Sequence, residues 1–156
     1  MAEPINIFSA ENSEGRMDVA RAVKSATTTM YLYDLAPGES SSPYHYEYDE
    51  EWLLVVEGTI ALRTPEGERA LERGDLFCFP PGPAGAHKVM NRSQSPARTV
   101  MFSGAGVPAV TVYPDSSKIG VWPGNEQDEL IFRRDAAVPW PDGEEGWDKA
   151  SERDVH

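Results

Sequence analysis

The sequence predicts an all-β fold, and two features of the chain support this prediction. Turn-forming residues recur at short intervals, and the 13 glycines and 13 prolines among 156 residues favour turns over long helices. The segments between the turns have the length of strands and are rich in β-branched and aromatic residues. We therefore expect strands at residues 28–35, 44–47, 51–56, 59–63, 68–71, 75–79, 86–90, 98–103 and 109–113.

The chain length fits one domain of ordinary size, which we expect to be a barrel over residues 28–113. An irregular extension is expected on each side. The N-terminal extension, residues 1–27, is polar and has the pattern of a short helix around residues 17–24. The C-terminal extension, residues 114–156, is acidic and proline-rich, with scattered tryptophans that favour packing on the barrel. Its last part, from residue 142, is expected to be mobile.

The net charge of the chain disfavours two classes of binding partner, nucleic acids and membrane surfaces. A formal net charge of -12 and a pI near 4.6 repel phosphate backbones and anionic lipids. Nucleic acid and membrane surfaces are therefore poor partners, and we expect a small molecule or another protein instead. The sequence has no run of 18 apolar residues, and its first ten residues lack the pattern of a signal peptide. These features predict a cytoplasmic protein.

Two histidines and two glutamates stand out as candidates for chemistry. Side chains alternate along a strand, so His45 and Glu47 project to the same side of the predicted strand at 44–47. Glu51 begins the next strand and can lie beside them, while His87 belongs to a later strand. Imidazole nitrogen and carboxylate oxygen together suit a divalent ion of the manganese, iron, cobalt, nickel or zinc type.

The stretches that contain these residues resemble the paired sequence motifs of the cupin superfamily. The first motif is usually a glycine, a short spacer, His-x-His, three or four residues, a glutamate, six residues and a glycine. The second is usually a glycine, five residues, Pro-x-Gly, a short spacer, a histidine, three residues and an asparagine. The first motif is represented here by Gly38, His45, Glu47, Glu51 and Gly58, and the second by Gly74, Pro80, Gly82, His87 and Asn91.

This resemblance implies a double-stranded β-helix, or jelly-roll barrel, with one divalent metal inside. The chain is most similar to small stand-alone bacterial cupins of the conserved-barrel type. Cupins of this kind include dioxygenases, decarboxylases, isomerases and epimerases. Many cupins are homodimers, and we expect one here because an open jelly roll has exposed strand edges that a second subunit can cover.

The chain departs from the usual first motif at two places. The spacer between Gly38 and His45 has six residues where five are usual, and Glu47 replaces the second histidine. Two interpretations of Glu47 are open. It completes a four-residue metal shell of His45, Glu47, Glu51 and His87, or it acts as a catalytic acid or base beside a three-ligand site. The sequence does not choose between them.

The expected function is that of a metal-dependent enzyme acting on a small, oxygen-rich organic molecule. The alternative is a non-catalytic module that only binds or senses such a molecule. Several tyrosines in the predicted strands can line a pocket for a planar ligand, but strands are generally rich in tyrosine, so packing is the simpler expectation. These tyrosines are Tyr31, Tyr33, Tyr44, Tyr46 and Tyr48.

Overall fold

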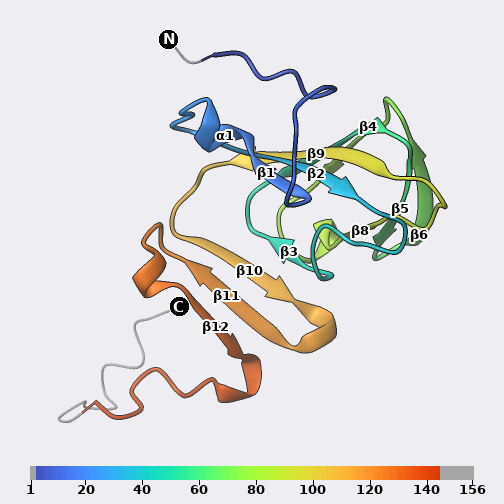
Figure 1. Cartoon of the computed structure of the whole chain (residues 1–156). Coiled ribbons are helices and arrows are strands. Elements are labelled where there is room, and N and C mark those ends of the chain that lie inside the picture. The colour runs from blue at the N-terminus through green and yellow to red at the C-terminus, as the bar shows by residue number, and fades with distance from the viewer. Residues whose placement is uncertain (1–2, 145–156) are drawn as a thin grey trace.

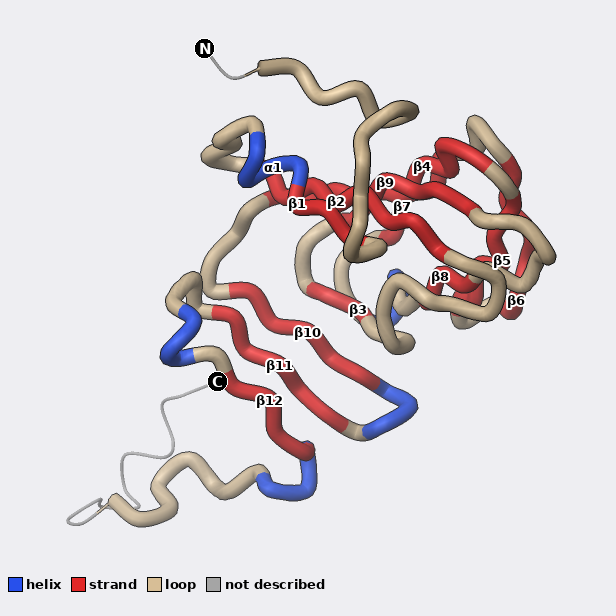
Figure 2. Tube along the Cα trace, viewed as in Figure 1, coloured by secondary structure: helices blue, strands red, loops and turns tan. Residues whose placement is uncertain are grey.

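The computed structural model describes residues 3–144, and strands dominate this part of the chain (Figures 1 and 2). The strands are β1 (Arg16–Asp18), β2 (Thr28–Leu35), β3 (Tyr46–Glu47), β4 (Glu51–Glu57), β5 (Thr59–Thr64), β6 (Gly67–Glu72), β7 (Leu76–Phe79), β8 (Lys88–Met90), β9 (Ala97–Gly104), β10 (Ala109–Tyr113), β11 (Lys118–Trp122) and β12 (Leu130–Arg133). The helical segments are α1 (Val19–Ala22), η1 (Pro83–Gly85), η2 (Pro114–Ser116), η3 (Glu126–Asp128) and η4 (Arg134–Ala136).

The strands form three antiparallel sheets. The largest has five strands in the order β1-β2-β9-β4-β7, and a three-stranded sheet has the order β6-β5-β8. A third sheet has the order β12-β11-β10-β3, and Figure 1 shows β10, β11 and β12 as a layer beside the other strands. The prediction of an all-β fold is confirmed, and each of the nine predicted strands has a counterpart within two residues of its expected ends.

The main hydrophobic core lies between the five-stranded and three-stranded sheets. Alternation along β4 explains how one strand serves two layers. Leu53 and Val55 are fully buried in the main core, where Ile60 and Leu62 of β5 meet them. The alternate residues of β4, Leu54 and Val56, point to the opposite face of the same sheet, where a second apolar cluster lies.

The N-terminal segment covers the outer face of the five-stranded sheet. Ile5, Ile7 and Met17 pack against the second cluster, whose buried members include Val19 and Leu32. Residues 16–18 form β1, which pairs antiparallel with β2, and α1 follows over Val19–Ala22. The predicted helix around residues 17–24 is therefore shorter than expected. Its first residues extend a sheet instead, because β2 offers a free edge there.

The C-terminal extension is more regular than the sequence indicated. β11 pairs with β10 over five residue pairs, and β12 pairs with β11 over four. The expectation of an irregular segment is wrong for these nine residues. The two strands are short, but they are rich in the β-branched and aromatic residues that favour strands. The acidic and proline-containing residues around them hid this signal. Trp147 and most of the segment expected to be mobile lie outside the described residues.

None of the helices in residues 3–144 is long and apolar enough to cross a membrane. The division into a barrel over residues 28–113 and two flanking extensions stays a prediction.

Candidate metal centre

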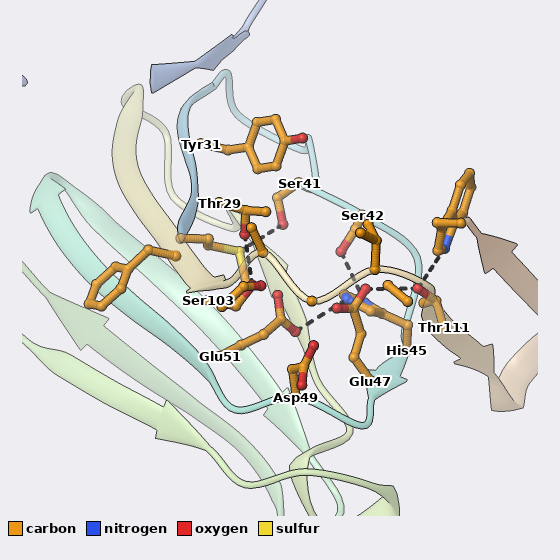
Figure 3. Close-up of a pocket in the computed structure, with 18 of the residues that line it drawn as sticks. Thr29, Tyr31, Ser41, Ser42, His45, Glu47, Asp49, Glu51, Ser103 and Thr111 are labelled. Carbon is orange, nitrogen blue, oxygen red and sulfur yellow. Dashed lines mark hydrogen bonds and ion pairs between the residues drawn. The ribbon is translucent and has the colours of Figure 1, made fainter. Parts of the chain in front are cut away.

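Three side chains from separate segments meet at one end of the main core. His45 lies directly before β3, Glu51 begins β4, and His87 lies between η1 and β8. One donor atom from each of them lies within 4.8 Å of the other two. The Nε2 atom of His45 lies 3.7 Å from Oε2 of Glu51, and Nε2 of His87 lies 3.6 Å from the same oxygen. Figure 3 shows Glu51 and His45 facing each other in the pocket.

Backbone pairing fixes the spacing of the two histidines. The N–H of His45 donates to the carbonyl oxygen of His87 at 3.0 Å, and the N–H of His87 donates to the carbonyl oxygen of His45 at 2.8 Å. Residues paired in this way carry their side chains on the same face of a sheet. The two imidazole rings accordingly lie side by side, with centroids 4.6 Å apart.

Each histidine is also oriented through its other ring nitrogen. Nδ1 of His45 lies 2.9 Å from the carbonyl oxygen of Pro43, and Nδ1 of His87 lies 2.9 Å from that of Gly85. A carbonyl oxygen only accepts, so both rings carry their proton on Nδ1 and present a lone pair at Nε2. Phe79 fixes the His87 ring further by stacking on it, with 3.7 Å between centroids.

The pKa shifts of the three groups leave them with little positive charge, which favours binding of a cation. Burial lowers the pKa of His87 to about 3, with a smaller contribution from His45, and burial also lowers the pKa of His45. Burial raises the pKa of Glu51 to about 8, and the carboxylates of Glu47 and Asp49 add to this shift. Without a cation, the histidines are therefore neutral and Glu51 tends to hold its proton.

A divalent transition metal fits this donor set. Nε2 of His87 is buried and has no hydrogen-bond partner, which leaves a polar atom unsatisfied unless something binds it. Ligands about 2.1 Å from an ion lie roughly 3.0 to 3.4 Å apart at octahedral or tetrahedral angles, a little less than the 3.6 and 3.7 Å that separate Oε2 of Glu51 from the two histidine nitrogens. Two imidazoles with a carboxylate are a common set for such ions, and each imidazole has the Nδ1 hydrogen bond that metal-bound histidines usually make.

Glu47 lies in the same pocket but outside this three-residue group. Its Oε1 atom accepts a hydrogen bond from the hydroxyl of Thr111 at 2.7 Å, and that hydroxyl in turn accepts one from the indole N–H of Trp122 at 2.8 Å. Thr111 lies in β10 and Trp122 in β11, so both partners belong to the sheet β12-β11-β10-β3, called the C-terminal sheet from here on, to which Glu47 itself contributes through β3. Figure 3 shows the Glu47 carboxylate directed toward Thr111. This arrangement favours the interpretation of Glu47 as an acid or base beside a three-ligand site.

The site opens into a pocket of about 650 Å³ between the five-stranded sheet and the C-terminal sheet. The predicted alternation at β3 is observed, because His45 and Glu47 line the pocket while Tyr46 packs in a small apolar cluster on the other side. The tyrosines divide between the two expected roles. Tyr31 and Tyr33 line the pocket, whereas Tyr46 packs as expected.

Several pocket residues lie outside the motifs and were missed by sequence reasoning. They come from β1, from β9 and the loop after it, and from the C-terminal sheet, and they include Arg16, Met101, Thr111, Tyr113 and Trp122. Strand alternation places Thr111 and Tyr113 on one face of their strand, which is the one signal that was available. The sequence contained no signal that this face meets the motif residues.

Comparison with known proteins agrees with the motifs. Residues 31–103 match the Cupin domain family. This segment is a cupin domain. Among characterised relatives, the tetracenomycin polyketide synthase protein TcmJ of Streptomyces glaucescens is 33% identical over 67 residues, which are 43% of this chain and 44% of that protein. The chain therefore matches less than half the length of this relative. The matched stretch of 67 residues is shorter than the predicted barrel of residues 28–113.

Solved structures extend the similarity of this cupin beyond the barrel. A cupin described as a sugar phosphate isomerase from Silicibacter pomeroyi superposes with a TM-score of 0.72 at 25% identity, over 83% of each chain. A cupin described as a putative sugar phosphate isomerase from Acidithiobacillus ferrooxidans gives a TM-score of 0.71 at 21% identity, over 80% of this chain and 78% of that one. The second likeness concerns the fold alone.

Proposed function

We propose that this cupin is a metal-dependent enzyme that rearranges a small, oxygen-rich carbonyl compound by moving a proton. One divalent transition metal of the manganese, iron, cobalt, nickel or zinc class would be held by His45, Glu51 and His87. The observation that carries the proposal is the position of Glu47, which lines the same pocket as His45 and Glu51 but lies outside the group of donors that these two residues form with His87.

The lining of the pocket favours a planar, hydroxylated or keto-bearing substrate. Aromatic and apolar side chains supply flat surface, among them Tyr31, Tyr33 and Met101. Hydroxyl groups of serine and threonine supply hydrogen bonds. Arg16 is the one cationic side chain among the described residues of the lining, whereas four carboxylates line it. A phosphate dianion is therefore a weaker candidate than a neutral molecule or a monoanion.

The residues around the site are suited to proton transfer next to a carbonyl group. When bound, the metal would supply Lewis acidity to a carbonyl oxygen. Glu47 would take a proton from the adjacent carbon and return it elsewhere, as a general base and then a general acid. The Thr111 hydroxyl, which donates to Glu47, would keep the second carboxylate oxygen free for this work. Proton transfers of this kind typically contribute about a hundredfold to ten-thousandfold in rate.

The comparisons support this choice of chemistry among the activities that cupins perform. TcmJ is named as a polyketide synthase protein, and polyketide chains carry carbonyl groups next to acidic carbons. The structural neighbour at 25% identity is described as a sugar phosphate isomerase, and isomerisation of a sugar also moves a proton beside a carbonyl. Moving a proton beside a carbonyl group is favoured by a Lewis acid or its equivalent together with a base in one pocket.

The metal can be tested before the substrate is known. Purified protein should contain close to one transition metal per chain by mass spectrometry of the elements, and a chelator should lower its melting temperature. His87→Ala and Glu51→Ala should lose the metal, whereas Glu68→Ala, an exposed carboxylate on β6, should keep it. Full metal content in both ligand variants would refute the site.

The reaction is tested with a panel of diketones, polyphenols and hydroxy ketones in deuterated water. Exchange of a carbon-bound hydrogen for deuterium, lost in Glu47→Gln, would support the proposal. Tight binding of a panel member with no exchange and no product would instead support the binding or sensor module. The expectation that the chain does not bind nucleic acid or membranes stays a prediction based on its net charge of -12.

A further inference from the structure

The edge of the C-terminal sheet is the most exposed apolar part of the described chain. Nine large hydrophobic side chains are exposed among residues 3–144, and five of them lie between residues 130 and 140. Three are consecutive in β12: Leu130, Ile131 and Phe132 are 60%, 55% and 38% exposed. β12 is also the outermost strand of its sheet, as Figure 1 shows. An exposed apolar edge strand invites pairing with another strand.

The hydrogen bonds of β12 determine which of its backbone groups are available. The N–H of Arg134 donates to the carbonyl oxygen of Ser117 at 2.9 Å, so this pair is hydrogen-bonded. Hydrogen-bonded and non-hydrogen-bonded pairs alternate along an antiparallel ladder. Given the register of β11 and β12, Leu130 and Phe132 therefore bond inward to β11. Ile131 and Arg133 present their N–H and C=O groups outward.

The sequence of this edge is complementary to itself in one register. If two copies of β12 pair antiparallel about a two-fold axis at Ile131, Glu129 of each copy lies opposite Arg133 of the other. The apolar side chains of Leu130 and Phe132 then lie opposite each other on the other face of the ribbon. Neither Glu129 nor Arg133 makes an ion pair with another described residue. Opposite charges and apolar pairs directly across a ladder both stabilise it.

Neighbouring registers are less favourable. An axis at Phe132 places Glu129 opposite Asp135 and Ile131 opposite Arg133. An axis at Arg133 brings two arginines together. A two-fold axis midway between two residues is excluded. It would place a residue whose N–H and C=O groups point outward opposite a residue whose groups point toward β11. The register about Ile131 is the one that satisfies backbone, charge and apolar groups together.

From these relationships we infer that the chain forms a two-fold dimer in which two β12 edges pair about Ile131 and join the two C-terminal sheets into one eight-stranded sheet. The partner is a second copy of this chain, since the edge matches its own sequence in both charge and apolar pattern. Glu129 also lines the pocket, so the dimer contact reaches the rim of the candidate site. The dimer does not depend on the proposed reaction.

The test is a charge swap in the full-length chain. The wild type should have twice its 17.2 kDa mass by light scattering at micromolar concentration. Glu129→Arg and Arg133→Glu should each raise the dimer dissociation constant at least about tenfold, because each places like charges together twice. The double variant should restore dimerisation to within a few-fold of the wild type. Glu72→Arg, an exposed reversal on β6, is the control and should leave the dimer unchanged.

A second variant tests the backbone contact itself. Ile131→Pro removes an outward N–H and should yield a monomer whose circular dichroism is unchanged, since Ile131 is exposed and its N–H has no partner in β11. A monomeric wild type would overturn the inference, and so would a dimer that neither single charge reversal weakens. Failure of the double variant to recover would also overturn it, because the register requires that rescue.

Discussion

The carboxylate of Glu47 accepts a hydrogen bond from the Thr111 hydroxyl at 2.7 Å, and this contact joins the motif strand β3 to its neighbour β10 in the C-terminal sheet. The backbones of the two residues are paired as well, since Thr111 of β10 lies opposite Glu47 of β3. Glu47 is thus held by a strand that contributes no member to the three-residue metal group. The side chain of Glu47 and the three candidate metal ligands are therefore held by different contacts, and they can be tested separately.

The first prediction concerns the division of labour between Glu47 and the metal group. Glu47→Gln should keep the metal content of the wild type, because His45, Glu51 and His87 supply the donors without it. It should lower turnover about a hundredfold or more, because an amide cannot accept the substrate proton. Metal content and deuterium exchange measured on the same sample check both parts.

Glu47→His is the companion variant, since it restores the residue that the first motif usually has. If Glu47 is not a ligand, this variant should keep the metal and lose turnover. If Glu47 is a fourth ligand, Glu47→Gln should instead release metal, and Glu47→His should shift preference toward ions that favour nitrogen. Loss of metal in Glu47→Gln would contradict the three-residue site.

The second prediction concerns Gly85, whose carbonyl oxygen orients the His87 ring through Nδ1. A Cβ atom at Gly85 would collide with the carbonyl oxygen of Pro80, and backbone atoms cannot move aside as a flexible side chain can. Gly85→Ala should therefore displace the turn and weaken metal affinity about tenfold to a hundredfold, as loss of such an orienting contact usually does. Competition with a coloured chelator measures the affinity.

The control for this prediction lies in the same turn. Ala84 is exposed, so Ala84→Ser should leave the metal affinity unchanged. Wild-type affinity in Gly85→Ala would show that the His87 ring does not depend on this contact.

Much of the fold could be predicted because each barrel strand carries its own signal. Thr28 to Leu35 is bounded by turn residues and is rich in β-branched and aromatic side chains, and its predicted ends match β2. β11 and β12 are also rich in β-branched and aromatic residues, but they have only five and four residues and lie among acidic and turn-forming residues, so they were not predicted. What the local sequence did not show is how these strands pair, β11 with β10 and β12 with β11.

The candidate site, too, could be predicted from the sequence only in part. His45, Glu51 and His87 could be found because motif spacing and strand alternation act over short stretches of chain. The side of the strand on which Glu47 lies could be predicted as well, but its contact with Thr111 could not, because Thr111 is 64 residues away in sequence. The choice between a four-ligand and a three-ligand site depends on that long-range contact.

The third prediction concerns Asn91, the last residue of the second motif, which is fully buried. Its side-chain N–H groups donate to the carbonyl oxygens of Leu35 and Ser95, both at 2.8 Å. Its side-chain oxygen accepts from the N–H and the hydroxyl of Ser93. Asn91→Ala should lower the free energy of unfolding by about 3 kcal/mol, because buried partners lose their hydrogen bonds.

Urea denaturation measures this loss, and Gln94→Ala, an exposed change in the same turn, should cost far less. Equal stability of the two variants would mean that the buried network of Asn91 contributes little. Because Asn91 lies outside the pocket lining, metal content at low temperature should be unchanged.

The fourth prediction concerns Arg98, a residue of β9 whose side chain contacts both the five-stranded sheet and the N-terminal segment. Its guanidinium group forms a two-point ion pair with Asp34, at 2.6 and 2.8 Å. The same group donates to the carbonyl oxygens of Ile7, Phe8 and Ala10, at 3.0 to 3.1 Å. A planar fork of donors can satisfy acceptors on two chain segments at once, which a lysine ammonium cannot.

Arg98→Ala should therefore lower the free energy of unfolding by about 2 to 4 kcal/mol, since Asp34 and three carbonyl groups lose a charged partner. Arg98→Lys should recover only part of this loss. Hydrogen exchange gives a more specific measurement, because the N-terminal segment should lose protection in Arg98→Ala while the strands of the main core retain it. Arg21→Ala, an exposed arginine in α1, is the matched control and should change neither quantity. Unchanged protection of residues 5–10 in Arg98→Ala would mean that their apolar packing on Leu32 and Val100 holds the segment without the ion pair.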